Sequence, residues 1–169
     1  MMKTCLFEDD VIEYFNKYWI EHCDTDRLLF DEKYHKLHNV RRLHPYSTHK
    51  EFFDKIKYIE QVSPFYTLDT CYMLEYSKGS FAELHHDHRS KLTTVTILNK
   101  SKDLRGGELL ISDNVSTSSI DLQVGETYFY DQTVKHGVAK VVEGTRRVLI
   151  TWMEDRKSTR LNSSHTSTS

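Results

Sequence analysis

The sequence predicts a mainly β domain, an antiparallel sandwich or barrel, with two flanking helices. Two observations support this fold class: helical periodicity is confined to the first 64 residues, and after Pro64 the chain breaks into short β-type runs. Polar or glycine-containing breaks separate these runs, and no helices interleave, which is typical of antiparallel architectures. The predicted strands are 65–76, 91–99, 107–112, 119–124, 126–131, 136–142 and 146–153.

Two amphipathic helices are predicted, over 8–22 and 49–60. Each has apolar side chains at helical spacing, and Thr48 and Glu51 have the spacing of a capping box. The apolar faces comprise Val11, Phe15, Tyr18 and Trp19 in the first helix, and Phe52, Phe53, Ile56 and Ile59 in the second. Residues 31–48 lack a clear period and are rich in His, Arg, Lys and Tyr; a solvated connection is favoured there over a substrate-facing loop.

The domain organisation follows from this pattern. We expect residues 1–64 to be a helical support and residues 65–154 to be the β core, together forming one domain. From Asp155 the composition becomes rich in Ser, Thr, Asn and Arg, which predicts a disordered segment at 155–169. The run DRKSTRLNSSH also resembles one reading frame of a sequencing adapter, so this tail is interpreted as an assembly artefact.

The composition of the chain argues against several classes of protein, including general nucleic-acid binders and membrane-spanning proteins. The chain has 169 residues and a formal net charge of −2, which gives no general field for nucleic acid or an anionic membrane. No stretch approaches the about 18 apolar residues that a membrane span needs, so a soluble, cytoplasmic protein is expected. The three cysteines are odd in number and lack CxxC spacing, which argues against a disulfide framework or a zinc knot.

A candidate metal site lies in LHHDHRS (84–90). In an extended chain residues i and i+2 share a face, so His85 and Asp87 can converge on one ion while His86 and His88 point away. His136, at the start of a later strand, is in register to add a second imidazole. Two histidines and one carboxylate on one face leave three coordination positions open, as in non-haem Fe(II) oxygenases.

Arg146 strengthens this interpretation. It lies ten residues after His136 on a predicted core strand, where a buried guanidinium needs an anionic partner such as a dicarboxylate. Arg146 and Arg147 point to opposite faces, so only one of them can be inside. For either arginine, a surface salt bridge is the simpler alternative.

An ordered set of motifs resembles the 2-oxoglutarate/Fe(II)-dependent dioxygenase superfamily, and within it the prolyl-4-hydroxylase-like, PKHD-type hydroxylase branch. The motifs are YSKGSFAELHHD, KLTTVTILNKSKDLRGGELLI and VGETYFYDQTVKHGVAKVVEGTRRVLITW, which cover about residues 70–153. They include Tyr-x-x-Gly before HxD, a strand ending in LN, a GGEL turn, and then His, Gly-x-Arg and Trp in the family's order. This ordered set is far more specific than HxD alone.

The resemblance implies a double-stranded β-helix, the cupin-like jelly roll. It implies that His85, Asp87 and His136 bind Fe(II), that Arg146 pairs with the distal carboxylate of 2-oxoglutarate, and that Tyr76 lines the co-substrate pocket. The implied cofactors are Fe(II), 2-oxoglutarate and O₂, with L-ascorbate as an auxiliary.

One position departs from the family pattern. Many relatives have tyrosine just before LN, where this chain has Ile97. Thr94 and Thr96 point to the opposite face from Ile97, which leaves Tyr72 or Tyr128 as sources of the missing hydroxyl. Use of a different 2-oxo acid is a further alternative.

The branch implies hydroxylation of an unactivated C–H bond in a protein or peptide side chain. A nucleobase demethylase of the same superfamily is the nearest alternative, but it would show a basic groove and a second arginine several residues after the first. A non-catalytic cupin-like metal-binding module is another alternative, for which His86 or His88 would have to complete a closed four-ligand site. An inactive interaction domain is the third.

Overall fold

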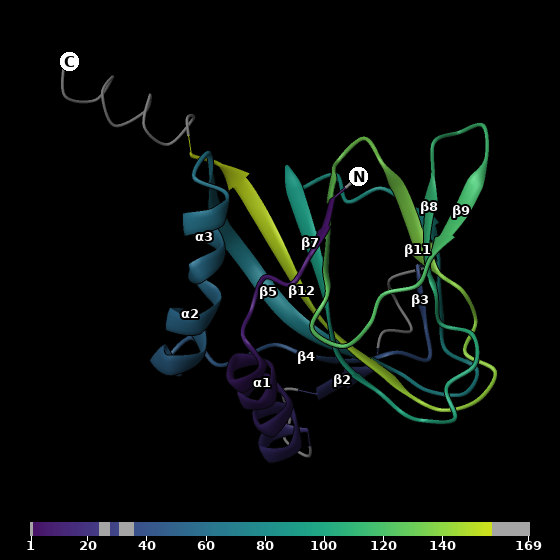
Figure 1. Cartoon of the computed structure of the whole chain (residues 1–169), viewed down its shortest axis with the longest axis horizontal. Coiled ribbons are helices and arrows are strands. Elements are labelled where there is room, and N and C mark those ends of the chain that lie inside the picture. The colour runs from purple at the N-terminus through teal and green to yellow at the C-terminus, as the bar shows by residue number, and fades with distance from the viewer. Residues whose placement is uncertain (1, 24–27, 31–35, 157–169) are drawn as a thin grey trace.

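The computed structural model describes residues 2–23, 28–30 and 36–156, and it consists of two antiparallel sheets with helices on one side (Figure 1). The strands of the larger sheet, in spatial order, are β1 (Met2–Thr4), β10 (Thr127–Asp131), β7 (Leu92–Lys100), β12 (Arg146–Asp155), β5 (Tyr66–Tyr76), β4 (Arg41–Leu43) and β2 (Leu28–Phe30). Those of the smaller sheet are β3 (Leu37–His38), β6 (Phe81–His85), β11 (Lys135–Val138), β8 (Leu109–Ser112) and β9 (Thr117–Ile120). The predicted mainly β class is confirmed.

The helices cover the outer face of the larger sheet. They are α1 (Asp9–His22), α2 (Lys50–Ile56) and α3 (Tyr58–Val62). Phe15, Trp19 and Phe52 from this layer pack with Met73 and Leu149 from the sheet in one buried cluster. In the described part of the chain, none of these helices combines the length and apolar character needed to cross a membrane.

The central strand β12 is buried on both faces, because helices lie on one side of it and the smaller sheet on the other. Leu149 and Met153 join the helix-side cluster, whereas Val148 and Ile150 join a second cluster between the two sheets. A strand that is buried on both faces has apolar residues in succession instead of alternation. This explains the continuous run VLIT and places the start of β12, at Arg146, inside the sandwich.

Several predicted boundaries were wrong. The second helix is interrupted at Lys57, and His49, not Thr48, is the N-cap of α2, which has no side-chain cap hydrogen bond. The capping box is therefore absent, because Glu51 falls one position too early in a helix that begins at Lys50. The predicted strands 119–124 and 136–142 end early, at Ile120 and Val138.

The N-terminal segment also supplies strands that the sequence did not predict. β1 pairs with β10, and β4 pairs with β5, so residues before 65 extend the larger sheet. β6, which carries His85, was also missed as a separate strand. Strands of two to five residues are too short to show a period, and their pairing partners lie far away in the sequence.

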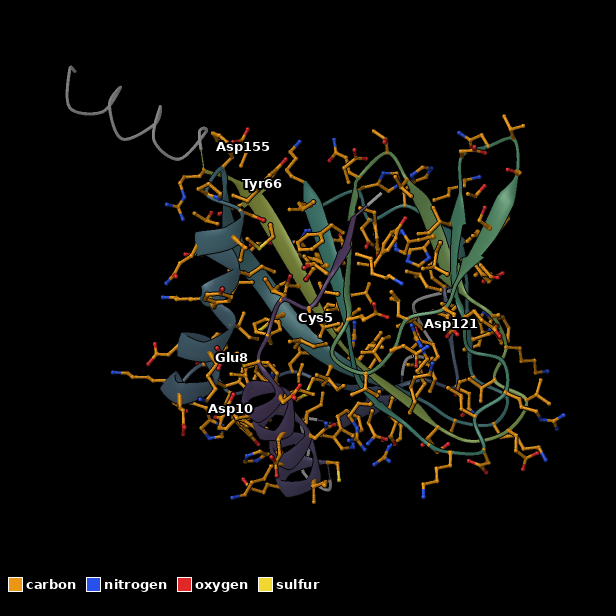
Figure 2. The ribbon with its side chains drawn as sticks, viewed as in Figure 1. Cys5, Glu8, Asp10, Tyr66, Asp121 and Asp155 are labelled. Atoms are coloured by element: carbon orange, nitrogen blue, oxygen red, sulfur yellow. The ribbon has the colours of Figure 1, made fainter. Side chains whose placement is uncertain are left out.

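The predicted tail begins too early. Asp155 belongs to β12 and pairs with Tyr66 of β5, and the two residues lie beside each other in Figure 2. The Arg156 amide donates to the Phe65 carbonyl at 2.9 Å. Backbone pairing with β5 thus extends the strand into polar sequence; residues 157–169 of the predicted tail lie outside the described residues.

Phe15→Ala should destabilise the protein by about 3 to 5 kcal/mol, because the fully buried ring contacts Phe7 and Phe52 and its loss leaves a cavity. Urea denaturation measures this change in the free energy of unfolding. Ile20→Ala in the same helix is the matched control, since Ile20 is 67% exposed and should change stability little. Equal losses in both variants would contradict the assignment of the buried helix face.

Candidate active site

Two neighbouring strands of the smaller sheet place the two histidines. His85 at the end of β6 and His136 in β11 are direct partners in the antiparallel register, and their rings lie 4.3 Å apart. A glycine permits this close pairing: a Cβ on Gly137 would lie 2.7 Å from the Ala82 carbonyl oxygen. The sequence-predicted register of His136 is therefore present in the fold.

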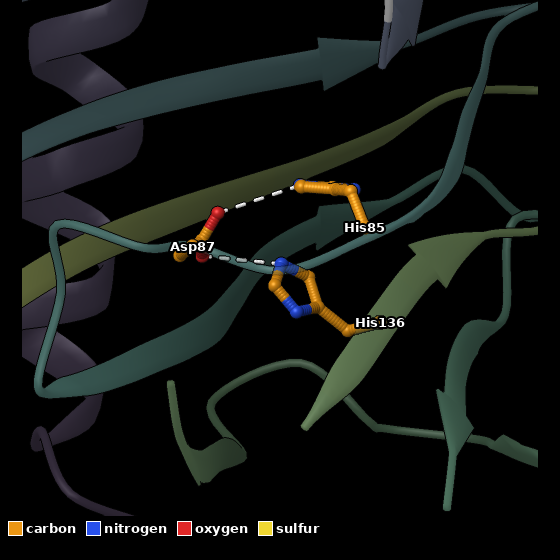
Figure 3. Close-up of side chains that lie close together, drawn as sticks. All are labelled: His85, Asp87 and His136. Atoms are coloured by element: carbon orange, nitrogen blue, oxygen red, sulfur yellow. Dashed lines mark ion pairs between the residues drawn. The ribbon is translucent and has the colours of Figure 1, made fainter. Parts of the chain in front are cut away.

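Asp87 completes the cluster from the turn after β6. Its Oδ1 lies 3.4 Å from His85 Nε2 and its Oδ2 lies 3.1 Å from His136 Nε2 (Figure 3). One potential ligand atom from each of the three residues falls within 4.8 Å of the others. The structure thus brings together the three residues that the sequence singled out.

The hydrogen bonds of the imidazoles suit a metal ion. His85 Nδ1 lies 2.6 Å from the Glu83 carbonyl oxygen and His136 Nδ1 lies 3.3 Å from that of Val134, so each Nδ1 carries the proton and donates. Each Nε2 then has a lone pair directed toward a carboxylate, which is itself an acceptor. Three converging acceptors repel one another unless a cation lies among them, and backbone-held Nδ1 atoms are typical of metal-ligating histidines.

The Asp87 carboxylate is held in its ionised form. Burial acts to raise the pKa of this carboxyl, but when His136 and His85 are protonated they outweigh burial and bring the pKa well below its ordinary value, as a cation bound among the three groups would also do. The Thr93 hydroxyl lies 3.4 Å from Asp87 Oδ2 and 2.8 Å from the Ser90 hydroxyl. Ser90 in turn donates to the Leu92 carbonyl, so the single Thr93 proton is shared between Ser90 and the more distant Asp87 carboxylate.

The other two histidines of the motif do not join this cluster. His86 Nδ1 bonds with the Gln132 carbonyl at 3.2 Å, and its ring lies 5.7 Å from that of His88. Among the described residues, the group that could hold a metal ion contains His85, Asp87 and His136 alone. The outward orientation predicted for His86 and His88 is consistent with this arrangement.

A cavity of about 420 Å³ extends from the triad into the space between the two sheets. Apolar side chains from both sheets line part of it, and its polar lining includes tyrosines, charged side chains such as Lys36 and Arg42, and Arg146. The lining residues that matter here are His85, Asp87, His136, Tyr72, Tyr76, Tyr130 and Arg146.

The two adjacent arginines separate as predicted. Arg147 points to the helix side, where it bonds with Glu75 Oε2 at 2.7 Å and with Asn16 Oδ1 at 2.8 Å. Arg146 is 3% exposed, lies over the Tyr76 ring at 5.6 Å, and lines the cavity. Its Nη1 is buried without a hydrogen-bond partner within the described part of the chain; burial lowers the pKa of the guanidinium, and Tyr76 and Glu108 act to raise it. An anion in the cavity would give this Nη1 an acceptor.

The structure separates the tyrosines that were considered for the missing hydroxyl. Ile97 is fully buried between the sheets. Tyr72 lines the cavity, but Tyr128 does not. Tyr130 also lines the cavity and was missed by the sequence analysis, although its spacing of two from Tyr128 in a strand places both on one face.

Residues 36–48 face the site more than predicted. Lys36, Leu37, Arg42 and His44 line the cavity, so the substrate-facing alternative fits this part of the segment better than a solvated connection. The reason is that β3 is an edge strand of the smaller sheet, beside β6, and β4 pairs with β5 in the larger sheet, so both lie next to strands that line the cavity. Residues 31–35 lie outside the described residues.

Comparison with known proteins identifies the family. The model of the 2OG-Fe(II) oxygenase superfamily matches residues 71–154, a range that contains the triad and Arg146. This chain belongs to the 2OG-Fe(II) oxygenase superfamily. The match confirms the resemblance that the ordered motifs predicted.

Individual relatives agree with this membership. A PKHD-type hydroxylase of Psychrobacter sp. (strain PRwf-1) is 38% identical over 66 residues, which cover 39% of this chain and 26% of that protein. The chain thus spans about a quarter of the length of this oxygenase-superfamily relative.

Solved structures show the same fold. A prolyl-4-hydroxylase of Pseudomonas putida has a TM-score of 0.69 at 18% identity, with 92% of each chain covered. A prolyl hydroxylase of Trichoplax adhaerens, in complex with a peptide fragment of the hypoxia-inducible factor oxygen degradation domain, has a TM-score of 0.72 at 12% identity and covers 95% of this chain and 86% of that one. The double-stranded β-helix predicted for this superfamily member is confirmed.

Thr93→Val should weaken binding of Mn(II) or Fe(II) about tenfold, because the hydroxyl that holds the Asp87 carboxylate is lost while side-chain volume is kept. Anaerobic isothermal titration calorimetry measures the metal dissociation constant. Thr94→Val is the matched control, since Thr94 bonds with Thr151 on the other face of the same strand. If both variants lose metal affinity equally, Thr93 has no specific effect on the carboxylate.

Arg146→Gln should weaken 2-oxoglutarate binding by about 10- to 100-fold and leave metal binding intact, because the buried cation that faces the cavity is lost. The paired variant Arg147→Gln should instead lower stability by about 1 to 3 kcal/mol by removing the bonds with Glu75. Calorimetry with the metal-loaded protein and urea denaturation separate the two effects. Unchanged 2-oxoglutarate affinity in Arg146→Gln would remove this residue from the co-substrate site.

Proposed function

We propose that this protein is an Fe(II)- and 2-oxoglutarate-dependent dioxygenase that hydroxylates an unactivated C–H bond. One cavity carries the proposal: its lining holds three converging metal-ligand atoms and a buried arginine whose Nη1 has no hydrogen-bond partner among the described residues. Each feature favours a ligand of opposite charge. A divalent metal ion and a dicarboxylate satisfy the two together.

Each site residue has a defined part in this proposal. His85, Asp87 and His136 hold the iron through two Nε2 atoms and one carboxylate, and leave its remaining positions facing the cavity. Arg146 binds the distal carboxylate of 2-oxoglutarate, and the neighbouring ring of Tyr76 lines that pocket. When bound, the iron supplies the activation of O₂ that couples decarboxylation of 2-oxoglutarate to hydroxylation of the substrate.

The protein contributes orientation and exclusion of water. Backbone carbonyls fix the two imidazole rings, and the Thr93 hydroxyl fixes the carboxylate. Burial raises the pKa of Tyr76 to about 12, so its phenol is neutral at physiological pH and can act as a donor. The overall reaction consumes O₂ and 2-oxoglutarate and yields succinate, CO₂ and a hydroxylated product, with one oxygen atom in succinate and one in the product.

A protein or peptide side chain is the proposed substrate. Support comes from the PKHD-type hydroxylase relatives and from the prolyl hydroxylase neighbours, one of which holds a peptide. The nucleobase demethylase alternative has less support, because Arg147, the only arginine soon after Arg146, is bonded to Glu75 on the far face. The closed four-ligand module lacks its fourth ligand among the described residues.

The test combines binding and turnover in the full-length chain. Under anaerobic conditions, Fe(II) and then 2-oxoglutarate are titrated into the protein; O₂ is then admitted and succinate is measured, with and without L-ascorbate. We expect stepwise binding of both ligands and formation of succinate, which L-ascorbate should increase. A protein that binds metal but neither binds nor consumes 2-oxoglutarate would overturn the proposal.

Asp87→Ala should abolish formation of succinate and weaken binding of Fe(II), since the only anionic ligand of the triad is removed. The control variant Asp103→Ala removes an exposed carboxylate from a turn remote from the cavity lining and should retain both properties. Undiminished turnover in Asp87→Ala would refute the assignment of the ligands.

A further inference from the structure

The proposed co-substrate pocket lacks a hydroxyl donor on β7. Ile97 is fully buried on the face of β7 that points between the sheets, and its side chain is apolar. Thr94 and Thr96 cannot replace it, because they bond with Thr151 and Thr127 on the opposite face. Any second donor to 2-oxoglutarate, besides Arg146, must therefore come from another strand.

Two of the nearby tyrosines are poorly placed for this task. Tyr128 is buried in the core and does not line the cavity. Tyr72 lines it, but its ring lies between His44 at 5.2 Å and Trp152 at 6.0 Å, with the Arg42 guanidinium over it at 6.0 Å. Tyr72 thus belongs with residues contributed by β4 and the last part of β12, away from Arg146 at the opposite end of that strand.

Tyr130 is placed differently. It lies on β10, is 7% exposed, lines the cavity, and has its ring 4.3 Å from that of His136. Its hydroxyl forms no hydrogen bond with any residue that the structure describes. The hydroxyl is not one of the fully enclosed unpaired atoms, and Tyr130 lines the cavity, so a ligand in the cavity can supply its acceptor.

In addition to burial, the charges of Asp87 and Arg146, which both line the cavity, shift the pKa of the Tyr130 hydroxyl. Burial raises the pKa of Tyr130 well above its ordinary value, the charge of Asp87 adds to the rise, and the charge of Arg146 opposes it. The Tyr76 hydroxyl is under the same two influences, whereas Arg146 does not affect the pKa of Tyr72 or Tyr128. Tyr76 and Tyr130 line the same cavity as the triad and Arg146, so a ligand that contacts both is within the space that these two tyrosines enclose.

We propose that Tyr130 donates its hydroxyl to a carboxylate of 2-oxoglutarate and so replaces the tyrosine that β7 lacks at Ile97. This inference rests on the proposed function, because it assumes that 2-oxoglutarate occupies the cavity. The neutral phenol can donate without adding charge beside Arg146. The ring, which packs against His136, also forms part of the wall that orients this imidazole.

Tyr130→Phe tests the inference, because it removes the hydroxyl and keeps the ring against His136. We expect the dissociation constant of 2-oxoglutarate from the Mn(II)-loaded protein to rise about tenfold, as for the loss of a hydrogen bond to a charged group, with unchanged affinity for Mn(II). Anaerobic calorimetry measures both constants without turnover. Tyr128→Phe is the matched control, with the same chemical change on the same face of the same strand, and it should bind both ligands like the unmodified chain.

The outcomes separate the two proposals. If the unmodified chain binds Mn(II) but not 2-oxoglutarate, the proposed function fails. If the unmodified chain binds both ligands and Tyr130→Phe retains its affinity for 2-oxoglutarate, the role of Tyr130 is refuted and the function stands. The role is likewise refuted if Tyr128→Phe loses as much affinity for 2-oxoglutarate as Tyr130→Phe does. It is also refuted if Tyr130→Phe loses as much affinity for Mn(II) as for 2-oxoglutarate, because the hydroxyl would then act through His136.

Discussion

The antiparallel pairing of β6 with β11 is the constraint on which the site depends. It makes His85 and His136 direct neighbours although they are 51 positions apart in the sequence. Gly137 allows the two backbones to approach, and the turn after β6 brings Asp87 back toward both rings. The candidate metal site is therefore formed by one strand pair and one turn, and the helices contribute none of its three residues.

The helices act on the site indirectly, by stabilising the larger sheet. They cover its outer face, so β5, β7 and β12 are buried on both sides and can carry residues of unlike chemistry on opposite faces. Arg147 is satisfied on the helix side by Glu75 and Asn16, while Arg146 enters the sandwich, where its Nη1 has no hydrogen-bond partner among the described residues. Two adjacent arginines thus lie in opposite environments, one paired on the helix side and one facing the cavity.

The cavity between the two sheets is lined by charged and polar groups that are not fully paired within the described residues. Three potential metal-ligand atoms converge on its wall, and the Arg146 guanidinium is buried there with its Nη1 unpaired among the described residues. Buried tyrosines with raised pKa values lie between them and stay neutral, so they can donate without altering the charge balance. A cation and a dianion together complete this arrangement better than either ligand alone.

The residues alone predicted the fold class, the strands β5 and β7 to β12, and the candidate residues His85, Asp87, His136 and Arg146. These features have local signals: alternation, burial runs, a spacing of two between His85 and Asp87, and an ordered set of family motifs. Only the tertiary structure decided what lacks a local signal, such as the short strands β1 to β4, the hydroxyl support of Asp87 by Thr93, and the separation of Tyr130 from Tyr72 and Tyr128. The physical reason is that pairing partners and cavity walls come from distant segments. A short strand or a tyrosine acquires its role from the neighbours that the fold brings to it, and these neighbours cannot be read from the residues beside it in the chain.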